Sequence, residues 1–333
     1  MDILTILSND ELREFAENLS YRTNFLGDKL FPSQKTDNIK ATMRSLMSGA
    51  SVPVMAQVHA LDTEARIGDR PSIQEVEFEK LLIKEKINQT ERLSYYKHDN
   101  ASNSALKRYI LDDAANMVSR VLTRAEVMKM EYLYSGKVTV DENNVRTTVD
   151  YKVPEKNRIP LSNWSSADAD ILGDIAKVQK AAKSKGYKVV RAITTSTVIG
   201  YMLNNKAIQA YWTNVNVPIT ESNMLAWIND NYKIQFVAND DVYKTKISAT
   251  SVYPFFKENT ISFITTMGTV GTGLFGVTPE ELELTNGQTS ERMKCAVTMW
   301  KSPDPVAVWT KATALYLPVP TDPNGLFIGT ITA

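Results

Sequence analysis

A glycine-rich stretch late in the chain is the first segment whose spacing could support chemistry, because closely spaced glycines let a backbone wrap around a phosphate. Its glycines are Gly268, Gly271, Gly273 and Gly276. A phosphate-binding loop also needs a Lys followed by Ser or Thr, which holds the phosphates and a metal ion. The stretch has no such pair and no strong helical pattern straight after it. We therefore predict a loop there and no nucleotide site.

Three aspartates resemble the start of a calcium-binding loop: Asp168, Asp170 and Asp174. In such a loop the fifth position supplies an oxygen ligand and the twelfth is a glutamate that binds through both oxygens. Counted from Asp168, these positions are Leu172 and Gln179, so the calcium interpretation fails. Acidic residues at the start of a helix interact favourably with the helix dipole, and this is our interpretation of the three aspartates.

The remaining candidates for catalysis or metal binding are two histidines and one cysteine, His59, His98 and Cys295. A structural zinc site needs several such ligands at close spacing, and one cysteine cannot form an internal disulfide. The chain also lacks the Gly-x-Ser-x-Gly motif of one class of hydrolases. We interpret the histidines as surface or interface residues and Cys295 as a buried, inert thiol. The sequence thus predicts no catalytic residue, no metal site and no cofactor.

The composition is that of a folded protein without a charge excess. Of 333 residues, 43% are hydrophobic, and 38 basic residues balance 38 acidic ones. A dedicated nucleic-acid-binding protein usually has a basic excess, whereas a neutral chain has little electrostatic protection against self-association. The N-terminus lacks the regions of a signal peptide, and no apolar run is long enough to span a membrane. We expect a protein of the cytoplasm with no membrane partner.

The first 92 residues suggest an arm followed by an extended hairpin. A helical pattern at 12–19 precedes a stretch at 24–32 that glycine and proline make irregular or extended. Strand-like alternation near 52–56 and 76–78 flanks a polar, charged tip, which predicts a long hairpin within 51–92. A two-stranded hairpin is marginal in water by itself. We expect this one to be ordered by packing on something else.

The clearest helix covers 103–135. Apolar side chains form one stripe at intervals of three and four residues, and no Gly or Pro interrupts it. The stripe contains Leu106, Ile110, Ala114, Met117, Val121, Ala125, Met128 and Tyr132, and it is widened by Val118 and Leu122. At ~1.5 Å per residue the helix is roughly 50 Å long. By itself this pattern fits an ordinary long core helix as well as a structural spine.

A hairpin and an α/β lobe follow the long helix. Alternation on both sides of an Asn-Asn turn predicts the hairpin at 137–151. From about 160 to 300 the pattern alternates between helices, near 165–186, 197–211 and 221–229, and strands, near 189–193, 234–237 and 260–265. The tail at 303–331 is strand-like. We expect the extended hairpin and this tail to share one sheet beside the long helix, with the lobe inserted between them.

In this order, the elements resemble the tailed-phage capsid fold of the Hong Kong 97 phage type, which is also found in encapsulins. The chain is similar in particular to the lambda protein E family. The resemblance covers nearly the whole chain, and the order of the elements carries most of it. The matching motifs are Val76-Glu77-Phe78 and Ile83-Lys84-Glu85-Lys86 at the end of the extended loop, Gly136 and the hairpin after the spine helix, and the Gly-rich turn after a strand at 261–276.

The resemblance implies an α+β fold of this type with several parts. The parts are an N-terminal arm at 1–50, an extended loop at 51–92, a peripheral domain at 93–160 and 301–333 that contains the spine helix, and an inserted axial domain at 161–300. The lobe would point toward the centres of hexamers and pentamers, and the arm and loop would reach onto neighbouring subunits. The family has no catalytic residues to transfer.

The implied function is that of a major capsid protein that self-assembles into the icosahedral shell around packaged double-stranded DNA. Its partners would be further copies of itself, a scaffolding protein, a portal and, as a further candidate, a decoration protein. Contact with the DNA would be non-specific, in agreement with the zero net charge. The location would be the virion capsid, with synthesis and assembly in the bacterial host cytoplasm.

Two alternatives remain at this stage. One is an encapsulin-like shell protein of a cellular compartment, which would enclose protein cargo in place of DNA. The other is an α/β enzyme, which the absence of paired His, Cys or phosphate-loop chemistry argues against.

Overall fold

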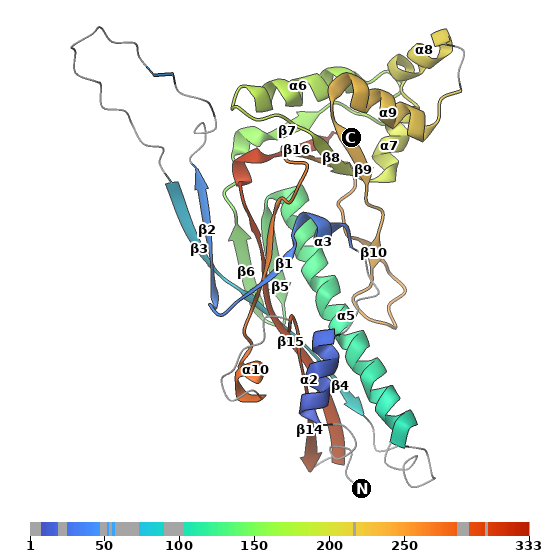
Figure 1. The fold of residues 1–333 in the computed structure, drawn as a ribbon. Coiled ribbons are helices and arrows are strands. Elements are labelled where there is room, and N and C mark those ends of the chain that lie inside the picture. The colour runs from blue at the N-terminus through green and yellow to red at the C-terminus, as the bar shows by residue number, and fades with distance from the viewer. Residues whose placement is uncertain are drawn as a thin grey trace, which may run out of the picture. The chain divides into compact units, whose positions relative to one another are not determined.

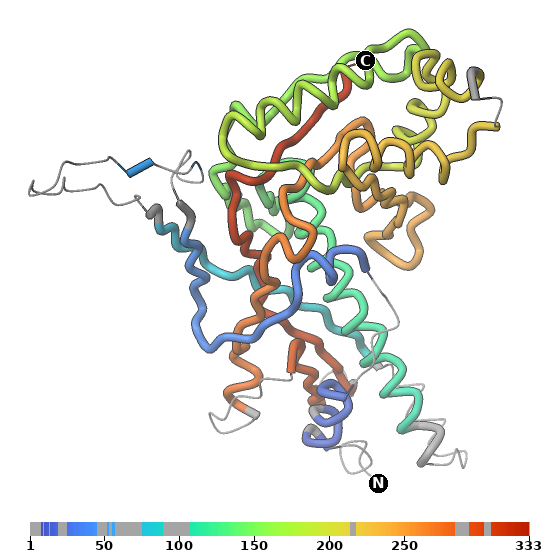
Figure 2. Tube along the Cα trace, turned by 45° about the horizontal axis from the view of Figure 1, so that its top comes forward, coloured from blue at the N-terminus to red at the C-terminus, as the bar shows by residue number. Residues whose placement is uncertain are grey.

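A computed structural model describes residues 8–18, 25–46, 52, 55–56, 73–89, 103–215, 218–284, 293–303 and 306–332. Both histidines and most of the hairpin tip expected at 57–75 lie outside the described residues. The chain divides into two compact units, each made of three separate stretches. The first unit comprises Met1–Thr42, Glu77–Lys129 and Gly271–Val319, and the second comprises Met43–Val76, Met130–Val270 and Pro320–Ala333. In Figure 2 the first unit therefore combines blue, cyan and orange segments.

The long helix α5 spans Asn103–Ser135, as the sequence predicts (Figure 1). Its predicted apolar stripe is buried from Ile110 onward. The buried members are Ile110, Ala114, Met117, Val118, Val121, Ala125, Met128 and Tyr132. Burial of one continuous stripe, and not the intrinsic propensity of the residues, is what stabilises a helix of this length.

The first unit contains a five-stranded sheet. Its strands are β1 (Ser33–Thr36), β4 (Leu81–Gln89), β13 (Gly271–Gly276), β14 (Ala296–Pro303) and β15 (Val306–Pro320). The order is β1-β13-β15-β14, and β4 also pairs with β15. The unit also contains the helices α2 (Asn9–Asn18), α3 (Leu26–Leu30) and α10 (Pro279–Leu284). The expectation that the extended hairpin and the tail share one sheet is met only by β4 and β15, because the strands of the hairpin itself pair in a separate sheet.

The extended hairpin begins earlier than predicted. Its first strand is β2 (Lys40–Leu46), which pairs with β3 (Ile73–Glu79) in a separate two-stranded sheet. The expected first strand at 52–56 is wrong at residues 52, 55 and 56, and 53–54 lie outside the described residues. The reason is that Ala41 and Met43, which are buried on β2, continue the alternation of the hairpin into the segment that we assigned to the arm.

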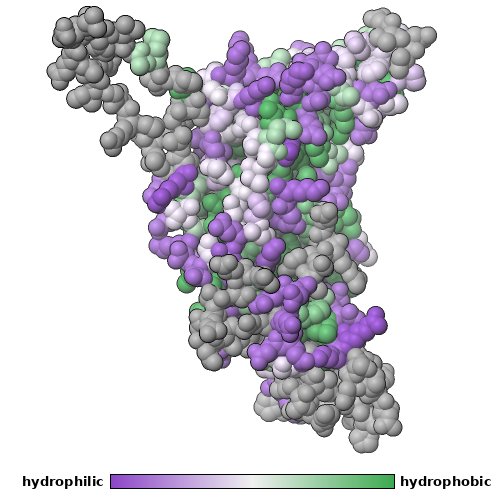
Figure 3. Space-filling view, viewed as in Figure 1, coloured by the Kyte–Doolittle hydropathy of each residue, from purple (hydrophilic) through white to green (hydrophobic). Residues whose placement is uncertain are grey.

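The second unit is built on another five-stranded sheet, in the order β7-β16-β12-β8-β9. The strands are β7 (Arg158–Leu161), β8 (Arg191–Thr194), β9 (Gln235–Ala238), β12 (Thr260–Ile264) and β16 (Leu326–Ile331). Four helices belong to this unit: α6 (Ile171–Lys183), α7 (Ser196–Leu203), α8 (Lys206–Val215) and α9 (Glu221–Tyr232). Its core includes Ile175, Val178, Ile199, Ile228 and Phe263. Hydrophilic residues lie over the outer side of α6 in Figure 3.

Shorter elements complete the second unit. The predicted hairpin after α5 consists of β5 (Lys137–Glu142) and β6 (Val145–Asp150). Its turn residues Asn143 and Asn144 have φ of 49° and 64°, as a two-residue hairpin turn of this kind requires. A second small hairpin joins β10 (Val242–Tyr243) to β11 (Tyr253–Pro254), and two 3₁₀ turns cover Glu155–Asn157 and Pro323–Gly325.

Three expectations need correction. The helix expected at 197–211 is two helices, α7 and α8. The tail does not lie in one sheet, because β15 pairs with β4 whereas β16 lies between β7 and β12. The glycines at 271–276 form the strand β13, not a loop. A Cβ on Gly273 would lie 2.9 Å from the Tyr316 hydroxyl, so the glycines allow close packing within the sheet.

Candidate functional site

A buried ionic group ties the segment after α2 to the spine helix. The backbone N–H of Gly27 donates a hydrogen bond of 2.7 Å to Glu126 Oε1. Lys129 Nζ lies 3.3 Å from Glu126 Oε2 and 2.6 Å from Asp28 Oδ1. The side chains of Glu126 and Lys129 are only 2% and 4% exposed. Removing one partner of such a pair leaves an uncompensated buried charge, which is strongly destabilising. This group therefore holds α3 against α5.

Two details of this group follow from its tight packing. A side chain at position 27 would overlap the Glu126 carboxylate, so only glycine fits there. Burial raises the pKa of Glu126, because desolvation disfavours the charged carboxylate, and the charge of Lys129 only partly offsets this effect.

A second set of buried charges fixes β1 and the turn between β3 and β4. Lys35 on β1 forms an ion pair with Glu281 on α10, and both side chains are almost fully buried. Lys80 Nζ donates hydrogen bonds to Thr36 Oγ1 and to the carbonyl oxygen of Asn38. Burial lowers the pKa of Lys80. The start of β4 is thus tied to the end of β1.

The longest strand contact of the first unit joins β4 to β15. Antiparallel pairing runs from Val308 opposite Gln89 to Tyr316 opposite Leu81. On the other side of β15, β14 pairs from Ala296 opposite Thr313 to Pro303 opposite Val306. Arg120 on α5 also forms an ion pair with Glu85 on β4. These contacts fix β4, the strand that follows the extended loop, to β15 and to the spine helix.

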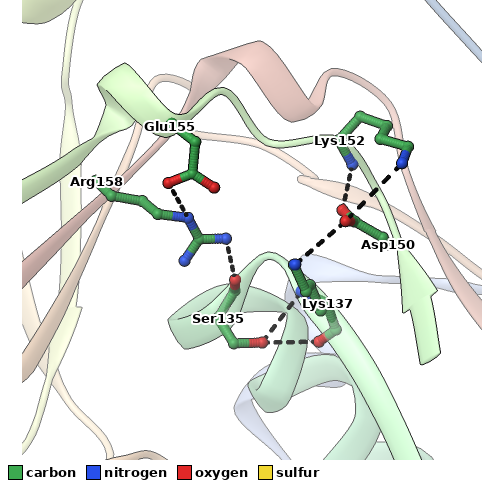
Figure 4. Close-up of polar contacts among 6 residues, drawn as sticks. All are labelled: Ser135, Lys137, Asp150, Lys152, Glu155 and Arg158. Atoms are coloured by element: carbon green, nitrogen blue, oxygen red, sulfur yellow. Dashed lines mark hydrogen bonds and ion pairs between the residues drawn. The ribbon is translucent and has the colours of Figure 1, made fainter.

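In the second unit, polar contacts fix the end of the spine helix (Figure 4). Gly136 has φ of 71° and its N–H donates to the Tyr132 carbonyl at 2.7 Å, which ends the helix in a left-handed residue. Arg158 Nη2 donates to the Ser135 carbonyl oxygen at 2.6 Å. A cation at this position also interacts favourably with the negative end of the helix dipole. The direction in which the β5–β6 hairpin leaves α5 is therefore set by specific hydrogen bonds.

The base of this hairpin carries one acid between two lysines. Lys137 Nζ lies 3.2 Å from Asp150 Oδ2, and the backbone N–H of Lys152 donates to Asp150 Oδ1 at 2.9 Å. Burial of Asp150 would raise its pKa, but the hydrogen bonds from Lys152 and Lys137 outweigh this effect, so the pKa is lowered. Asp150 is thus held in its charged form, and its role at the base of the hairpin is structural.

Of the residues singled out for chemistry, those that the structure describes do not come together into a site. Asp170 caps α6 by accepting a hydrogen bond from the N–H of Gly173, and Asp174 lies in the first turn, so the helix-start interpretation is supported for these two. It is wrong for Asp168, which lies before the helix and forms an ion pair with Lys206. Asp174 accepts hydrogen bonds from Ser162 and from Trp164 Nε1. Among the described residues, no group of three or more His, Cys, Asp or Glu side chains is placed to hold a metal ion.

Cys295 is buried, as predicted. Burial raises the pKa of its thiol to about 12. No helix within the described part of the chain is long and apolar enough to cross a membrane.

The sequence analysis missed the buried charges Lys35, Lys80, Glu126, Lys129 and Glu281. For two of them a signal was available. Glu126 and Lys129 directly follow the stripe residues Ala125 and Met128 on α5. They therefore lie at the edge of the apolar face, where a charged side chain is partly or fully removed from water. Their partner Gly27 is distant in sequence, so no local pattern could identify it.

The contacts described above fix segments of the chain to a structural frame. Comparison with known proteins identifies the class of protein. The family model of phage major capsid protein E matches residues 8–331. The chain belongs to this family. It is therefore a structural subunit of a phage capsid, and the family supports the phage alternative over a cellular compartment. No curated protein matches the chain in sequence.

Solved structures agree on the fold. A capsid protein of a prophage from E. coli CFT073 is similar with a TM-score of 0.61 at 13% identity, covering 100% of this chain and 99% of that one. A phage-related protein from Bordetella bronchiseptica RB50 has a TM-score of 0.59 at 11% identity, covering 96% and 95% of the two chains. The predicted fold class, α+β of the Hong Kong 97 phage type, is confirmed.

Proposed function

We propose that copies of this major capsid protein assemble as pentamers and hexamers into an icosahedral shell that encloses packaged double-stranded DNA. Assembly takes place in the cytoplasm of the bacterial host, and the mature location is the virion. The family match carries the proposal, because the matched residues 8–331 include both compact units.

The β2–β3 hairpin supports assembly through neighbouring copies. Within the described residues, its two strands pair with each other and with no further strand. An isolated two-stranded sheet is marginal in water. Exposed side chains alternate along β3, with Glu75, Glu77 and Glu79 on one face. Ala41 and Met43 on β2 are already buried within the chain, so packing on another subunit covers the side that stays exposed.

The parts of the chain have different roles in this proposal. The arm at 1–50 and the extended loop at 51–92 reach onto neighbours, the peripheral domain at 93–160 and 301–333 forms the frame, and the axial domain at 161–300 points toward the centres of the capsomers. These boundaries stay a prediction. The compact units divide the chain differently, because 271–300 belongs to the first unit, whereas 130–160 and 320–333 belong to the second.

The further partners are a scaffolding protein, a portal and, as a further candidate, a decoration protein. Contact with DNA is non-specific, which agrees with the zero net charge of the chain. The chain has no enzymatic role and needs no cofactor. Buried charges such as Glu126 and Lys129 serve to fix segments in place.

Electron microscopy of the purified chain tests the proposal. The chain is expressed with and without the scaffolding protein encoded by the same phage, and particles are isolated by gradient centrifugation and assayed for nucleic acid and for protein cargo. We expect closed icosahedral particles. A chain that stays monomeric with and without the scaffold at every salt concentration would contradict the proposal, and particles filled with one cargo enzyme would favour the compartment alternative.

A further inference from the structure

One face of the β14–β15–β4 part of the first unit's sheet is exposed to solvent at Lys84, Lys86 and Trp300. Along β4 the side chains alternate, so that Lys84 and Lys86 are exposed whereas Ile83 and Ile87 are half-buried. The strand register places Lys86 beside Lys311 on β15. One step further along the same face, Trp309 on β15 lies opposite Trp300 on β14. We call these five residues, Lys84, Lys86, Trp300, Trp309 and Lys311, the Trp–Lys face.

The two tryptophans of this face form a stacked pair. Their ring centroids are 6.4 Å apart with an interplanar angle of 14°. Lys86 Nζ lies 4.6 Å from the centroid of the Trp309 ring, and Lys311 Nζ lies 5.6 Å from that of Trp300. Trp300 remains 37% exposed. Tryptophan is enriched among the residues that dominate binding energy at protein interfaces, where one face of the ring becomes buried by a partner.

The charge around the tryptophans is positive. Glu280 Oε1 on α10 lies 2.6 Å from Lys311 Nζ and 3.6 Å from Lys84 Nζ. Three lysines and one glutamate leave a net charge of +2 on this face, whereas the whole chain has none. Lys84 and Lys86 are two residues apart on a strand, which separates them by about 7 Å. This is also the separation of acidic side chains at every second position of an extended peptide.

We propose that the Trp–Lys face binds an extended acidic segment of a second protein, with an apolar side chain seated on the tryptophan pair. The carboxylates of the segment pair with Lys84 and Lys86. The apolar side chain covers the exposed surface of Trp300. This inference rests on the proposed shell-forming role and goes beyond it, because it assigns a binding surface on the chain and the chemistry of the segment that the surface takes.

Two acids of the β2–β3 hairpin suit this face less well, because they are already paired within the chain. On β3, Glu77 Oε2 lies 3.0 Å from Lys40 Nζ, and Glu75 Oε1 lies 3.2 Å from Arg44 Nε. A second copy would have to give up these pairs to reach Lys84 and Lys86. Duplex DNA suits it less well too, because the Glu280 carboxylate would repel phosphates, and because the flat sides of paired bases are not available to tryptophan rings.

Fluorescence polarisation with a designed peptide tests the proposal on the full chain. The probe is a fluorescein-labelled peptide of about eight residues, roughly 26 Å when extended, with Glu at every second position and Leu in place of one central Glu. The binding variants are Lys84→Glu with Lys86→Glu, and Trp300→Ala. The matched control is Lys188→Glu with Lys257→Glu, which reverses two exposed lysines of the second unit. Circular dichroism verifies that every variant is folded.

We expect the wild-type chain to bind the peptide and the double reversal on the face to weaken binding by about tenfold or more. Trp300→Ala weakens peptide binding severalfold, and the dependence of its affinity on salt concentration stays that of the wild type. The affinity of the control pair stays within about twofold of the wild type. If Trp300→Ala does not fold, the charge reversal alone decides the test.

Three results would overturn the proposal. The first is no binding of the peptide, or equal binding by the face variant and the control. The second is binding of a 30-base-pair DNA duplex, in place of the peptide, that depends on Lys84 and Lys86. The third is loss of self-association in sedimentation by the face variant alone, which would assign the face to a second copy. Each of these results leaves particle formation by the wild-type chain unaffected, so failure here is distinct from failure of the proposed shell.

Discussion

Glu126 on the spine helix accepts a hydrogen bond from the backbone N–H of Gly27, which lies 99 positions earlier in the chain. The acceptor is a buried carboxylate, and its counter-ion Lys129 is on the same helix, one turn further on. The segment before β1 is therefore fixed at Gly27 by the Glu126 carboxylate, and the strength of this interaction depends on the burial of the carboxylate. An arm of a shell subunit has to be held in position before it can contact a neighbouring subunit. The hydrogen bond between Gly27 and Glu126 holds α3 in position.

The raised pKa of Glu126 leads to a pH-dependent stability. Because burial raises its pKa above the usual 4.5, the folded chain binds the proton more tightly than the unfolded chain. The resulting stabilisation is fully present below the unfolded pKa and is lost as the pH rises through the folded pKa. Gln at this position does not titrate. We therefore expect the Tm of Glu126→Gln minus the Tm of the wild type to become more positive from pH 4.5 to pH 7. Differential scanning fluorimetry measures both values.

The control for this experiment is Glu14→Gln, at an exposed position of α2. Its Tm should follow that of the wild type across the same pH range. A constant difference between Glu126→Gln and the wild type would show that the Glu126 carboxylate stays charged throughout, held by Lys129.

The parts of the fold with a strong local pattern could be predicted from the sequence. The stripe on α5 repeats over 33 residues, so its period and both ends were predicted correctly. The hairpin after it was predicted because Asn143 and Asn144 tolerate positive φ. In both cases neighbouring residues carry all of the information.

The errors concern partners that are distant in sequence. β13 was predicted as a loop because its glycines break any local pattern, yet they allow the strand to pack closely on Tyr316. β16 was assigned to the wrong sheet, since a short apolar strand fits either one until its partners β7 and β12 are known. The Gly27–Glu126 contact was missed for the same reason. Local patterns specify elements, whereas sheet order and buried ion pairs depend on tertiary packing.

Loss of the Arg158 side chain should weaken the end of the spine helix. Its guanidinium donates to the Ser135 carbonyl oxygen at 2.6 Å, and its side chain is 30% exposed. A hydrogen bond from a charged group at the end of a helix stabilises by about 1–2 kcal/mol. We expect Arg158→Ala to lower the free energy of unfolding by about this amount in urea denaturation.

The control is Arg146→Ala, which removes an ion pair with Asp141. The Arg146 side chain is 84% exposed, so this variant should lower the free energy of unfolding by less than about 0.5 kcal/mol. Equal effects of the two variants would refute a specific role for Arg158.

The buried thiol of Cys295 should be unreactive in the folded chain. Burial raises its pKa to about 12, so almost no thiolate is present at pH 8, and the thiolate is the reactive form. We expect Ellman's reagent to modify the native chain at a small fraction of the rate seen in urea, where the single cysteine reacts fully. Fast reaction of the native chain would mean that the strand around Cys295 opens readily, and Cys295→Ser at the same pH gives the background.

Val118 provides the sharpest test of the spine helix as the frame of the first unit. Its side chain is 1% exposed on the apolar stripe of α5. Asp at this position would bury a carboxylate on the apolar stripe of the helix. The cost is several kcal/mol, a large share of a total stability of about 5–15 kcal/mol. We expect Val118→Asp to accumulate as insoluble protein, measured as the soluble fraction after expression.

Asn116→Asp adds the same charge to an exposed position of the same helix and should remain soluble, with a helical circular dichroism spectrum. A soluble Val118→Asp chain with the wild-type Tm would place this face of α5 in solvent, and the packing of the first unit described above would then be wrong.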